Sequence, residues 1–565
     1  MAHPIPAMAT VPARDIDVNI RERIEKDLGR AVTAAGVDFC DYQCNAAFAI
    51  AKERGCKPID VANEIVAKFK SKIATAVAHP SGFVNISLTD DALNDMADDV
   101  IKVKKLPLPR QKRQTVFFDY GGANVAKQLH IGHLRAPIVG EALKRVYTAL
   151  GHHTISDPHF GDWGLQMGLV LAELVDEKFV KDGTLAKEIT LDTLNALYPT
   201  ASARSKADPE FYARAAQITV ELQKKTQPWY GLWQQIRRIS VDNITQSYIT
   251  LDCTFDTFEG ESDVEPYMPV VKDILRKHGA RVSEGCLVLD VAEPADPKPL
   301  PPVLLEKQNG GDLYATTDIA TIYRRQREYK PDAYVYVADY RQELHFQQVF
   351  RAVRRGIVPA DTRLTHVSFG TMNGTDGKPF KTRSGDTIKL DEVIATVTAA
   401  AAKQCRVEGI AQSVGLAALK FADLSNHVRK DYVFDLERFT SFEGKTGPYL
   451  LYTVARINSI EKKSAWGVTP PAPPRRGGVG EIISPTIKDI LRSINKLTDA
   501  YTTSAENYTL NPICDAAYNL AQKFNLLYAN ETIQDNAMNL RAAELVRCAL
   551  LFALDTLAIQ PVDEM

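Results

Sequence analysis

The chain has 565 residues, which is too many for one hydrophobic core and predicts three or four domains. Its net charge of -2 and ordinary 24% of charged residues exclude a generally basic nucleic-acid coat, although not a local basic face. There is no apolar run of membrane-spanning length, no signal-peptide core is expected, and the eight cysteines form no Cys-x-x-Cys pair. We therefore expect a reduced, cytoplasmic protein without a membrane partner.

The first periodic segment, residues 16–105, predicts a small α+β domain. Helical spacing occurs over residues 20–32 and again over residues 61–73, and the alternating residues 82–88 predict a strand. The basic segment 102–114 follows, with six Lys or Arg. It is interpreted as a solvated linker, and contact with a phosphate backbone is the alternative.

The middle of the chain, from Thr115 to about Ala400, alternates β-branched runs with amphipathic helices. This pattern is typical of a Rossmann-like, doubly wound parallel sheet, with a helical insertion at about 170–257. From Val414 to Ile559 the pattern is helical, apart from a loop rich in Pro and Gly at 467–481. The predicted domains are 1–106, 107–441 and an all-α domain at 442–565.

The strongest local signal combines a strand, a turn and a helix start. The strand at 115–120 is followed by glycines, by the sequence His-Ile-Gly-His at 130–133, and by an apolar-periodic helix. A helix N-terminus at a strand end presents free N–H groups to phosphates. Gly132 leaves room for a base or ribose, while His130 and His133 can donate hydrogen bonds to phosphate oxygens. The alternative is two surface histidines or half of a metal site.

A second signal is the glycine-bounded loop at 374–386, which carries Lys381 and Arg383. A mobile loop with two cations could close over a triphosphate. Such loops are usually only solvated, so this motif is weak alone.

Together these motifs resemble the HIGH and KMSKS signatures of class I aminoacyl-tRNA synthetases. Further segments narrow the resemblance to the arginyl-tRNA synthetases, and it extends from the segment at Gly82 to Met565. The segments that carry it are residues 119–135, 161–164, 314–318, 341–348, 378–384 and 446–449.

The resemblance implies that the chain activates L-arginine with ATP and esterifies it to the terminal adenosine of tRNA(Arg). Mg²⁺ would accompany ATP, held mainly by phosphates and water, and no protein-held structural metal is expected. The first domain would contact tRNA and the last would bind the anticodon. Members commonly need bound tRNA before they activate arginine. The expected partners are tRNA(Arg), L-arginine and ATP, without DNA, and the expected state is a monomer.

The resemblance also assigns residues to the substrate sites. A carboxylate group matches the five-donor guanidinium of arginine, and residues 314 and 318 share one helix face at a spacing of four. Without the resemblance, each acidic residue would be interpreted as a helix cap or an ion pair. The residues implied to bind arginine are Asp119, Asn124, Tyr314, Asp318 and Gln342. Those implied to bind ATP are His130, Gly132, His133, Lys381 and Ser384, and the catalytic set is His130, His133, Lys127, Lys381 and Arg383.

The sequence departs from the family pattern in three places. Phe380 and Arg383 replace the two lysines of KMSKS, and Lys127 is predicted to substitute for the missing charge. The glycines and alanine at 121–123 replace the usual Ser and Pro, which puts side-chain contacts from this stretch in doubt. Pro137, early in the helix after HIGH, removes a donor and could kink that helix.

Three other functions fit the sequence less well. Another class I synthetase is disfavoured by the segments at 314–318 and 342–345, and a HIGH-bearing nucleotidyltransferase without tRNA is typically shorter. A non-catalytic tRNA-binding paralogue is disfavoured by the intact HIGH residues and by Lys381. Editing is expected to be absent, because a guanidinium site leaves its carboxylates unpaired with analogues that lack this group.

Overall fold

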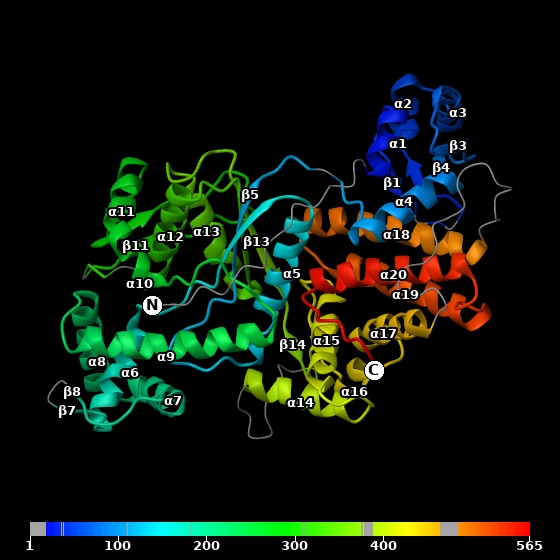
Figure 1. The fold of residues 1–565 in the computed structure, drawn as a ribbon. Helices are drawn as coiled ribbons and strands as arrows, with labels where there is room; N and C mark the ends of the chain where they lie inside the picture. Colours follow the sequence, from blue (N-terminus) through cyan, green and yellow to red (C-terminus); the bar gives the residue numbers. More distant parts are fainter. Residues whose placement is uncertain are drawn as a thin grey trace.

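The computed structural model describes residues 19–35, 37, 39–109, 111–181, 184–308, 310–311, 313–374, 377, 388–463 and 484–565. A small N-terminal domain sits above a C-terminal helical bundle, and the domain with the parallel sheet lies beside that bundle (Figure 1). The long helix α5 runs between the sheet and the bundle. The predicted loop at 467–481 falls outside the described residues.

The N-terminal domain packs helices on an antiparallel sheet of order β1-β2-β4-β3. The predicted strand at 82–88 is confirmed as β4, whose alternate residues are buried. The helix predicted over residues 61–73 ends earlier, at Lys68. The elements are α1 (Ile20–Leu28), β1 (Thr33–Ala34), β2 (Tyr42–Cys44), α2 (Ala46–Arg54), α3 (Pro58–Lys68), β3 (Ala74–Ala78), β4 (Val84–Leu88) and α4 (Asp90–Val103).

The predicted parallel sheet is confirmed, with strand order β13-β12-β5-β6. Its strands are β5 (Thr115–Tyr120), β6 (His153–Asp157), β12 (Ala333–Asp339) and β13 (Arg363–Phe369). Alternation along β5 sends Phe118 into a core shared with the N-terminal domain and the bundle, and Phe117 into a separate core under α11–α13.

Helices and three small sheets, β11-β10-β9, β14-β15 and β7-β8, surround this sheet within the described residues. The first half contains η1 (Ile131–His133), α5 (Arg135–Ala149), α6 (Leu165–Asp176), β7 (Val180–Lys181), β8 (Thr184–Leu185), α7 (Leu191–Ala207), α8 (Pro209–Gln223), α9 (Trp229–Thr250), α10 (Glu261–Val264), η2 (Glu265–Tyr267) and α11 (Met268–Lys277). The second half contains β9 (Arg281–Ser283), β10 (Cys286–Leu289), β11 (Val303–Glu306), α12 (Tyr314–Glu328), η3 (Tyr340–Gln342), α13 (Glu343–Val353), β14 (Met372–Asn373), α14 (Leu390–Ala402), α15 (Ala411–Leu424), β15 (Tyr432–Val433) and α16 (Leu436–Thr440).

Pro137 does not break the helix that follows HIGH. It is the third residue of α5, which continues to Ala149. The first four N–H groups of a helix have no partner inside the helix, so a missing N–H here removes no helical hydrogen bond. Position 137 is therefore one at which a helix tolerates proline.

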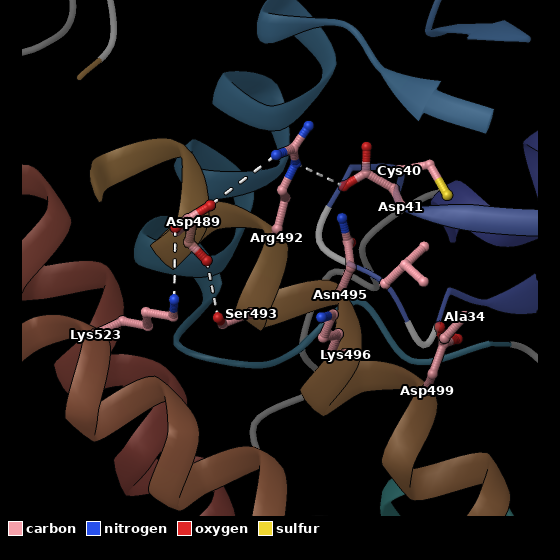
Figure 2. Close-up of a pocket in the computed structure, with 11 residues that line it drawn as sticks. Ala34, Cys40, Asp41, Asp489, Arg492, Ser493, Asn495, Lys496, Asp499 and Lys523 are labelled. Atoms are coloured by element: carbon pink, nitrogen blue, oxygen red, sulfur yellow. Dashed lines mark hydrogen bonds and ion pairs between the residues drawn. The ribbon is translucent and has the colours of Figure 1, made fainter. Parts of the chain in front are cut away.

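The C-terminal bundle consists of α17 (Gly447–Lys463), α18 (Pro485–Asn507), α19 (Asn511–Asn530) and α20 (Ala537–Thr556). The N-terminal domain docks on α18 and α20 through ion pairs, including Arg541 with Asp98 at 2.6 Å. Figure 2 shows a small pocket at this junction, of about 30 Å³, where Arg492 of α18 points at Asp41 of the N-terminal domain. The two side chains are 3.2 Å apart, from Nε to Oδ1.

Two cations, the buried Lys420 and the half-buried Arg145, link the bundle to the sheet domain. The Lys420 ammonium on α15 donates to the carbonyls of Leu251 and Ala558, which follow the ends of α9 and α20. Arg145 on α5 donates to the carbonyls of Asp252 and Asp555, both at 2.8 Å. Helix C-termini carry partial negative charge, so cations at this point stabilise both helix ends.

Candidate functional site

A cleft of about 400 Å³ opens where the strands of the parallel sheet end. This is the edge at which ligands bind in open α/β sheets. The residues that line it come from the loop after β5, from α6, α8, α10 and α11, and from the starts of α12 and α13. They are Asn124, Trp163, Gly164, Gln166, Gln223, Glu261, Met268, Leu313, Tyr314, Thr317 and Gln342.

Asn124 is positioned by close contact between two loops. It forms a β-bridge with Gly161, where an added Cβ would lie 2.2 Å from the Asn124 Oδ1. Only glycine therefore fits at position 161 without moving the amide. The unusual glycines before it are also accounted for, because Gly121 has φ +81° and a Cβ on Gly122 would meet the Pro158 carbonyl at 2.8 Å.

Tyr314 and Asp318 lie on the first turn of α12, as their spacing predicts. His345 of α13 holds both of them. Its Nε2 is 2.5 Å from the Asp318 Oδ2, and its ring stacks on Tyr314 with centroids 4.6 Å apart. Gln342 ends the short helix η3 and lines the same cleft. The structure thus brings Asn124, Tyr314 and Gln342 to one cavity, and Asp318 lies one helical turn after Tyr314, outside the residues that line this cavity.

Glu261 is a second acidic group of the cleft, and sequence reasoning missed it. It starts α10 and is buried, and its Oε2 accepts from the Trp163 N–H at 3.4 Å. Burial and the nearby negative charges of Asp162 and Asp318 raise the pKa of Glu261 to about 7, although His159 opposes them. A single glutamate between two loops carries no periodicity, so only the fold brings it into view.

Asp119 is placed differently from the other predicted arginine ligands. Its Oδ2 accepts from the Arg325 Nη1 at 2.6 Å, and like Asp318 it is not among the residues that line the cleft. The pKa of Tyr314 is raised well above its usual value, chiefly by Asp318, then by burial, by Glu261 and by Asp119. The negative charge of Asp119 therefore still acts on the cleft. The carboxylate nearest the strand end is thus engaged by a guanidinium of the chain itself.

The two HIGH histidines cap the start of the helix that follows them. The His130 Nδ1 accepts from the Gly132 N–H at 3.0 Å, and the His133 Nδ1 accepts from the His130 N–H at 3.1 Å. A ring nitrogen that accepts a backbone N–H carries no proton, so the hydrogen-bond network assigns the proton to Nε2 of each ring. Gly132 is exposed beside them, and an added Cβ would meet the His130 ring at 2.8 Å.

Burial, with the charge of Lys127 nearby, keeps both imidazoles neutral. The pKa of His130 is lowered to about 4, and that of His133, which also faces His130, to about 3. Each ring therefore presents one neutral N–H donor at physiological pH. Such donors suit phosphate oxygens that carry the charge themselves.

Comparison with known families agrees with this arrangement. A family model described as class I tRNA synthetases (R), catalytic domain, matches residues 97–436. The model of the arginyl tRNA synthetase N-terminal domain matches residues 15–88, and a DALR anticodon binding domain model matches residues 450–565.

The chain belongs to the arginyl-tRNA synthetase family.

Curated relatives match it over nearly their full length. A protein of Alkaliphilus oremlandii named arginine--tRNA ligase is 40% identical over 542 residues, covering 92% of this chain and 91% of its own. One of the same name from Agathobacter rectalis is 38% identical, covering 90% of each. The crystal structure of arginyl-tRNA synthetase from Plasmodium falciparum shares the fold, with a TM-score of 0.81, 22% identity and coverage of 96% and 97%. The Thermus thermophilus arginyl-tRNA synthetase has a TM-score of 0.79 and 22% identity, with coverage of 96% and 99%.

Lys127, which is predicted to substitute for the missing lysine of the loop, lies just before HIGH. It is half-buried, and burial lowers its pKa. Its Nζ lies 5.7 Å from the centroid of the Tyr198 ring, and within the described residues it forms no ion pair with a carboxylate. The ammonium is thus left available to an anion. The loop residues Lys381, Arg383 and Ser384 lie outside the described residues.

The described part of the chain contains no cluster of three His, Cys, Asp or Glu side chains placed to hold a metal ion. Nor does any helix there have both the length and the apolar character needed to cross a bilayer.

Proposed function

We propose that this protein is an arginine–tRNA ligase that activates L-arginine with ATP to arginyl-adenylate and transfers the arginyl group to the terminal adenosine of tRNA(Arg). The observation that carries the proposal is a cleft lined by Glu261, with the charge of Asp318 near it, together with a helix start that bears His130 and His133. The nearly full-length similarity to curated arginine--tRNA ligases supports it.

In this proposal the guanidinium of arginine lies between Glu261 and Asp318, against the Tyr314 ring. Charge-assisted bonds to a planar fork favour arginine over lysine, because a compact ammonium cannot span two carboxylates. Asn124 and Gln342, at the cleft wall, bind the amino and carboxyl ends. Asp119 adds negative charge behind them and acts through its pairing with Arg325.

The chemistry needs position and charge rather than a covalent intermediate. The arginine carboxylate attacks the α-phosphorus of ATP, and pyrophosphate leaves with its electron pair. The Nε2–H groups of His130 and His133 donate to phosphate oxygens, and the backbone at Gly132 accommodates the adenosine. Lys127, with Lys381 and Arg383 of the loop, neutralises the leaving pyrophosphate, and Ser384 binds ATP. Mg²⁺ enters as part of the ATP substrate, held by phosphates and water.

The transfer step uses a hydroxyl of the terminal adenosine of tRNA, the 2′-hydroxyl in class I enzymes. It attacks the carbonyl carbon of the adenylate, and AMP leaves. We expect residues 1–106 to contact the tRNA and residues 442–565 to bind its anticodon, with the protein acting as a cytoplasmic monomer.

Pyrophosphate exchange with each amino acid in turn, with and without total tRNA, tests the function. We expect exchange with arginine and with no other amino acid, followed by charging of tRNA. Exchange with a different amino acid identifies another class I synthetase. Exchange with no charging of tRNA identifies a nucleotidyltransferase, and tRNA binding without exchange identifies a non-catalytic paralogue.

A further inference from the structure

A fully buried arginine lies behind the cleft. Arg325 is on α12, two turns after Asp318, and its side chain has no exposed surface. Its Nη1 donates to Asp119 and its Nη2 to Asp157, both at 2.6 Å, and the guanidinium carbon is 4.3 Å from the centroid of the Phe117 ring. The protein therefore binds one of its own guanidinium groups at the ends of β5 and β6, beside the cleft in which we propose that the guanidinium of arginine binds.

The two carboxylates depend on Arg325 to different degrees. Asp157 also accepts from the Thr257 hydroxyl and the Glu259 N–H, both at 2.9 Å. Burial opposes the charged form, but the hydrogen bond from His159, the charges of Arg325 and His159, and the Glu259 N–H outweigh it and hold the pKa of Asp157 well below its usual range. For Asp119, Arg325 is the only hydrogen-bond donor within the described part of the chain, and burial raises its pKa. Asp119 thus depends mainly on Arg325, with a smaller contribution from the charge of His159.

We propose that Arg325 is a positioning residue that sets the specificity of the amino-acid cleft by occupying the guanidinium position between Asp119 and Asp157. The carboxylates left for an incoming guanidinium are then Glu261 and Asp318. This inference rests on the proposed function, since it concerns how the same cleft selects arginine.

The position of Arg325 on α12 links this pairing to the substrate contacts. The helix that carries Tyr314 and Asp318 at its start is tied by Arg325 to both β5 and β6. Without the guanidinium, that tie is lost and Asp119 becomes an unpaired carboxylate close to the cleft. A buried carboxylate that loses its partner is destabilised. The neighbouring helix therefore shifts, or the carboxyl takes up a proton. Both outcomes weaken arginine binding, while the HIGH histidines lie on a different helix.

Substitution of Arg325 by methionine tests this in the full-length protein. It keeps volume and removes the fork, so the KM for arginine should rise about tenfold or more, the scale of one lost charge-assisted pair. The KM for ATP should change by no more than about twofold, because the substitution weakens the binding of arginine and not that of ATP. Arg327→Met, an exposed position on the same helix, is the matched control and should leave both constants unchanged.

Chemical rescue separates the guanidinium position from a general packing role. Arg325→Ala leaves space for guanidinium ion, so guanidinium chloride should lower its arginine KM and raise its melting temperature, compared with sodium chloride at equal ionic strength. The wild type should show neither effect. Arg325→Lys, which keeps the charge, covers the case in which Arg325→Ala does not fold, and should keep a raised arginine KM because one ammonium cannot reach both carboxylates.

Two results would overturn the inference. One is an unchanged arginine KM in Arg325→Met or Arg325→Lys. The other is a parallel rise of both KM values with no response to guanidinium, which indicates a packing role alone. Failure of the proposed function has a different signature, namely no arginine-dependent exchange in the wild type. The melting-temperature response to guanidinium still reports on the Arg325 position in that case.

Discussion

At the residue scale, the cleft is notable for carboxylates that are compensated in different ways. Asp119 pairs with Arg325, Asp318 contacts His345, and Glu261 accepts, among the described residues, from one backbone N–H, that of Trp163 at 3.4 Å. Sequence reasoning predicted Asn124, Tyr314, Asp318 and Gln342 from family motifs, and the structure places three of them around one cavity and Asp318 one helical turn after Tyr314. It did not foresee Glu261 or the engagement of Asp119, because both depend on pairings between segments far apart in sequence.

The raised pKa of Glu261 predicts a specific pH dependence. Below its pKa of about 7 the group is protonated and no longer offsets a guanidinium, so kcat/KM for arginine should fall as pH decreases from 8 to 6. The KM for ATP should stay flat over this range, because His130 and His133 titrate only near pH 4 and 3. Steady-state kinetics at both substrates would measure this.

The control for this pH effect is Glu261→Gln. It should raise the arginine KM at pH 8 and remove most of the pH dependence, whereas Glu328→Gln, at the exposed end of α12, should change neither. A pH profile that is identical in wild type and Glu261→Gln would contradict the assignment.

Lys127 carries the second prediction at this scale. A charge that acts chiefly on the leaving pyrophosphate lowers kcat and kcat/KM together when it is removed. Lys127→Ala should lose about 10²-fold or more in kcat, the scale of one preorganised electrostatic donor, with a much smaller change in the arginine KM. If Lys127→Ala keeps near wild-type aminoacylation while Lys381→Ala does not, the loop alone neutralises the charge and the compensation hypothesis is wrong.

At the element scale, the strand β5 and the helix α5 followed directly from the sequence. Their periodicities differ clearly, and Gly151, with φ +90°, follows the end of the helix. The antiparallel sheet β11-β10-β9 was not predicted. Strand β9 has only three residues and no alternation of buried and exposed positions, and β10, although its four residues are an apolar run, is at the lower limit of length for a strand signal.

The contact between α5 and β5 predicts a sensitive glycine. A Cβ added at Gly140 would lie 2.2 Å from the Tyr120 ring, which is itself fully buried and donates to Glu141 at 2.6 Å. Gly140→Ala should therefore push α5 away from the sheet and cost about 1–3 kcal/mol of stability.

Because α5 begins directly after HIGH, Gly140→Ala should also raise the KM for ATP. Denaturant unfolding and steady-state kinetics would measure the two effects. Thr148→Ala, on the exposed side of the same helix, is the matched control and should stay within about 0.5 kcal/mol of the wild type. A stable Gly140→Ala protein with normal ATP kinetics would show that the helix is not held so closely.

At the scale of the whole molecule, the bundle and the nucleotide site share one helix. α5 carries HIGH at its start and contacts α18 and α20 further along, where Tyr147 donates to the Ala505 carbonyl at 3.1 Å. The fold class and the succession of a mixed domain, a parallel sheet and a helical bundle were predictable from changes in periodicity. The docking of these parts was not, since it depends on single cations such as Lys420 and Arg145 that resemble ordinary surface residues in the sequence.

This shared helix supports the prediction that arginine activation requires tRNA. Arginine-dependent pyrophosphate exchange should be undetectable without tRNA and appear when tRNA is added. Removal of residues 442–565 should abolish both half-reactions, although it also uncovers the outer face of α5. Strong exchange in the complete absence of tRNA would refute the requirement.

Lys420→Met is the less disruptive variant for the same question. It leaves two buried carbonyls without a donor, at a cost of about 1–3 kcal/mol for each unsatisfied group. If the docking of the bundle matters for activation, more tRNA should be needed to reach the maximal exchange rate.

The two hydrophobic cores give the cleft a mechanical property. Trp163 belongs to the large core that runs from the N-terminal domain through one face of the sheet to the bundle, whereas Met268 belongs to the smaller core under α11–α13. Both residues line the cleft, so its two walls are anchored in separately packed bodies. The walls can approach or separate by a small rotation about the sheet without breaking the packing of either core. A bound arginine that contacts Asn124 on one side and Tyr314 on the other would hold the two bodies together.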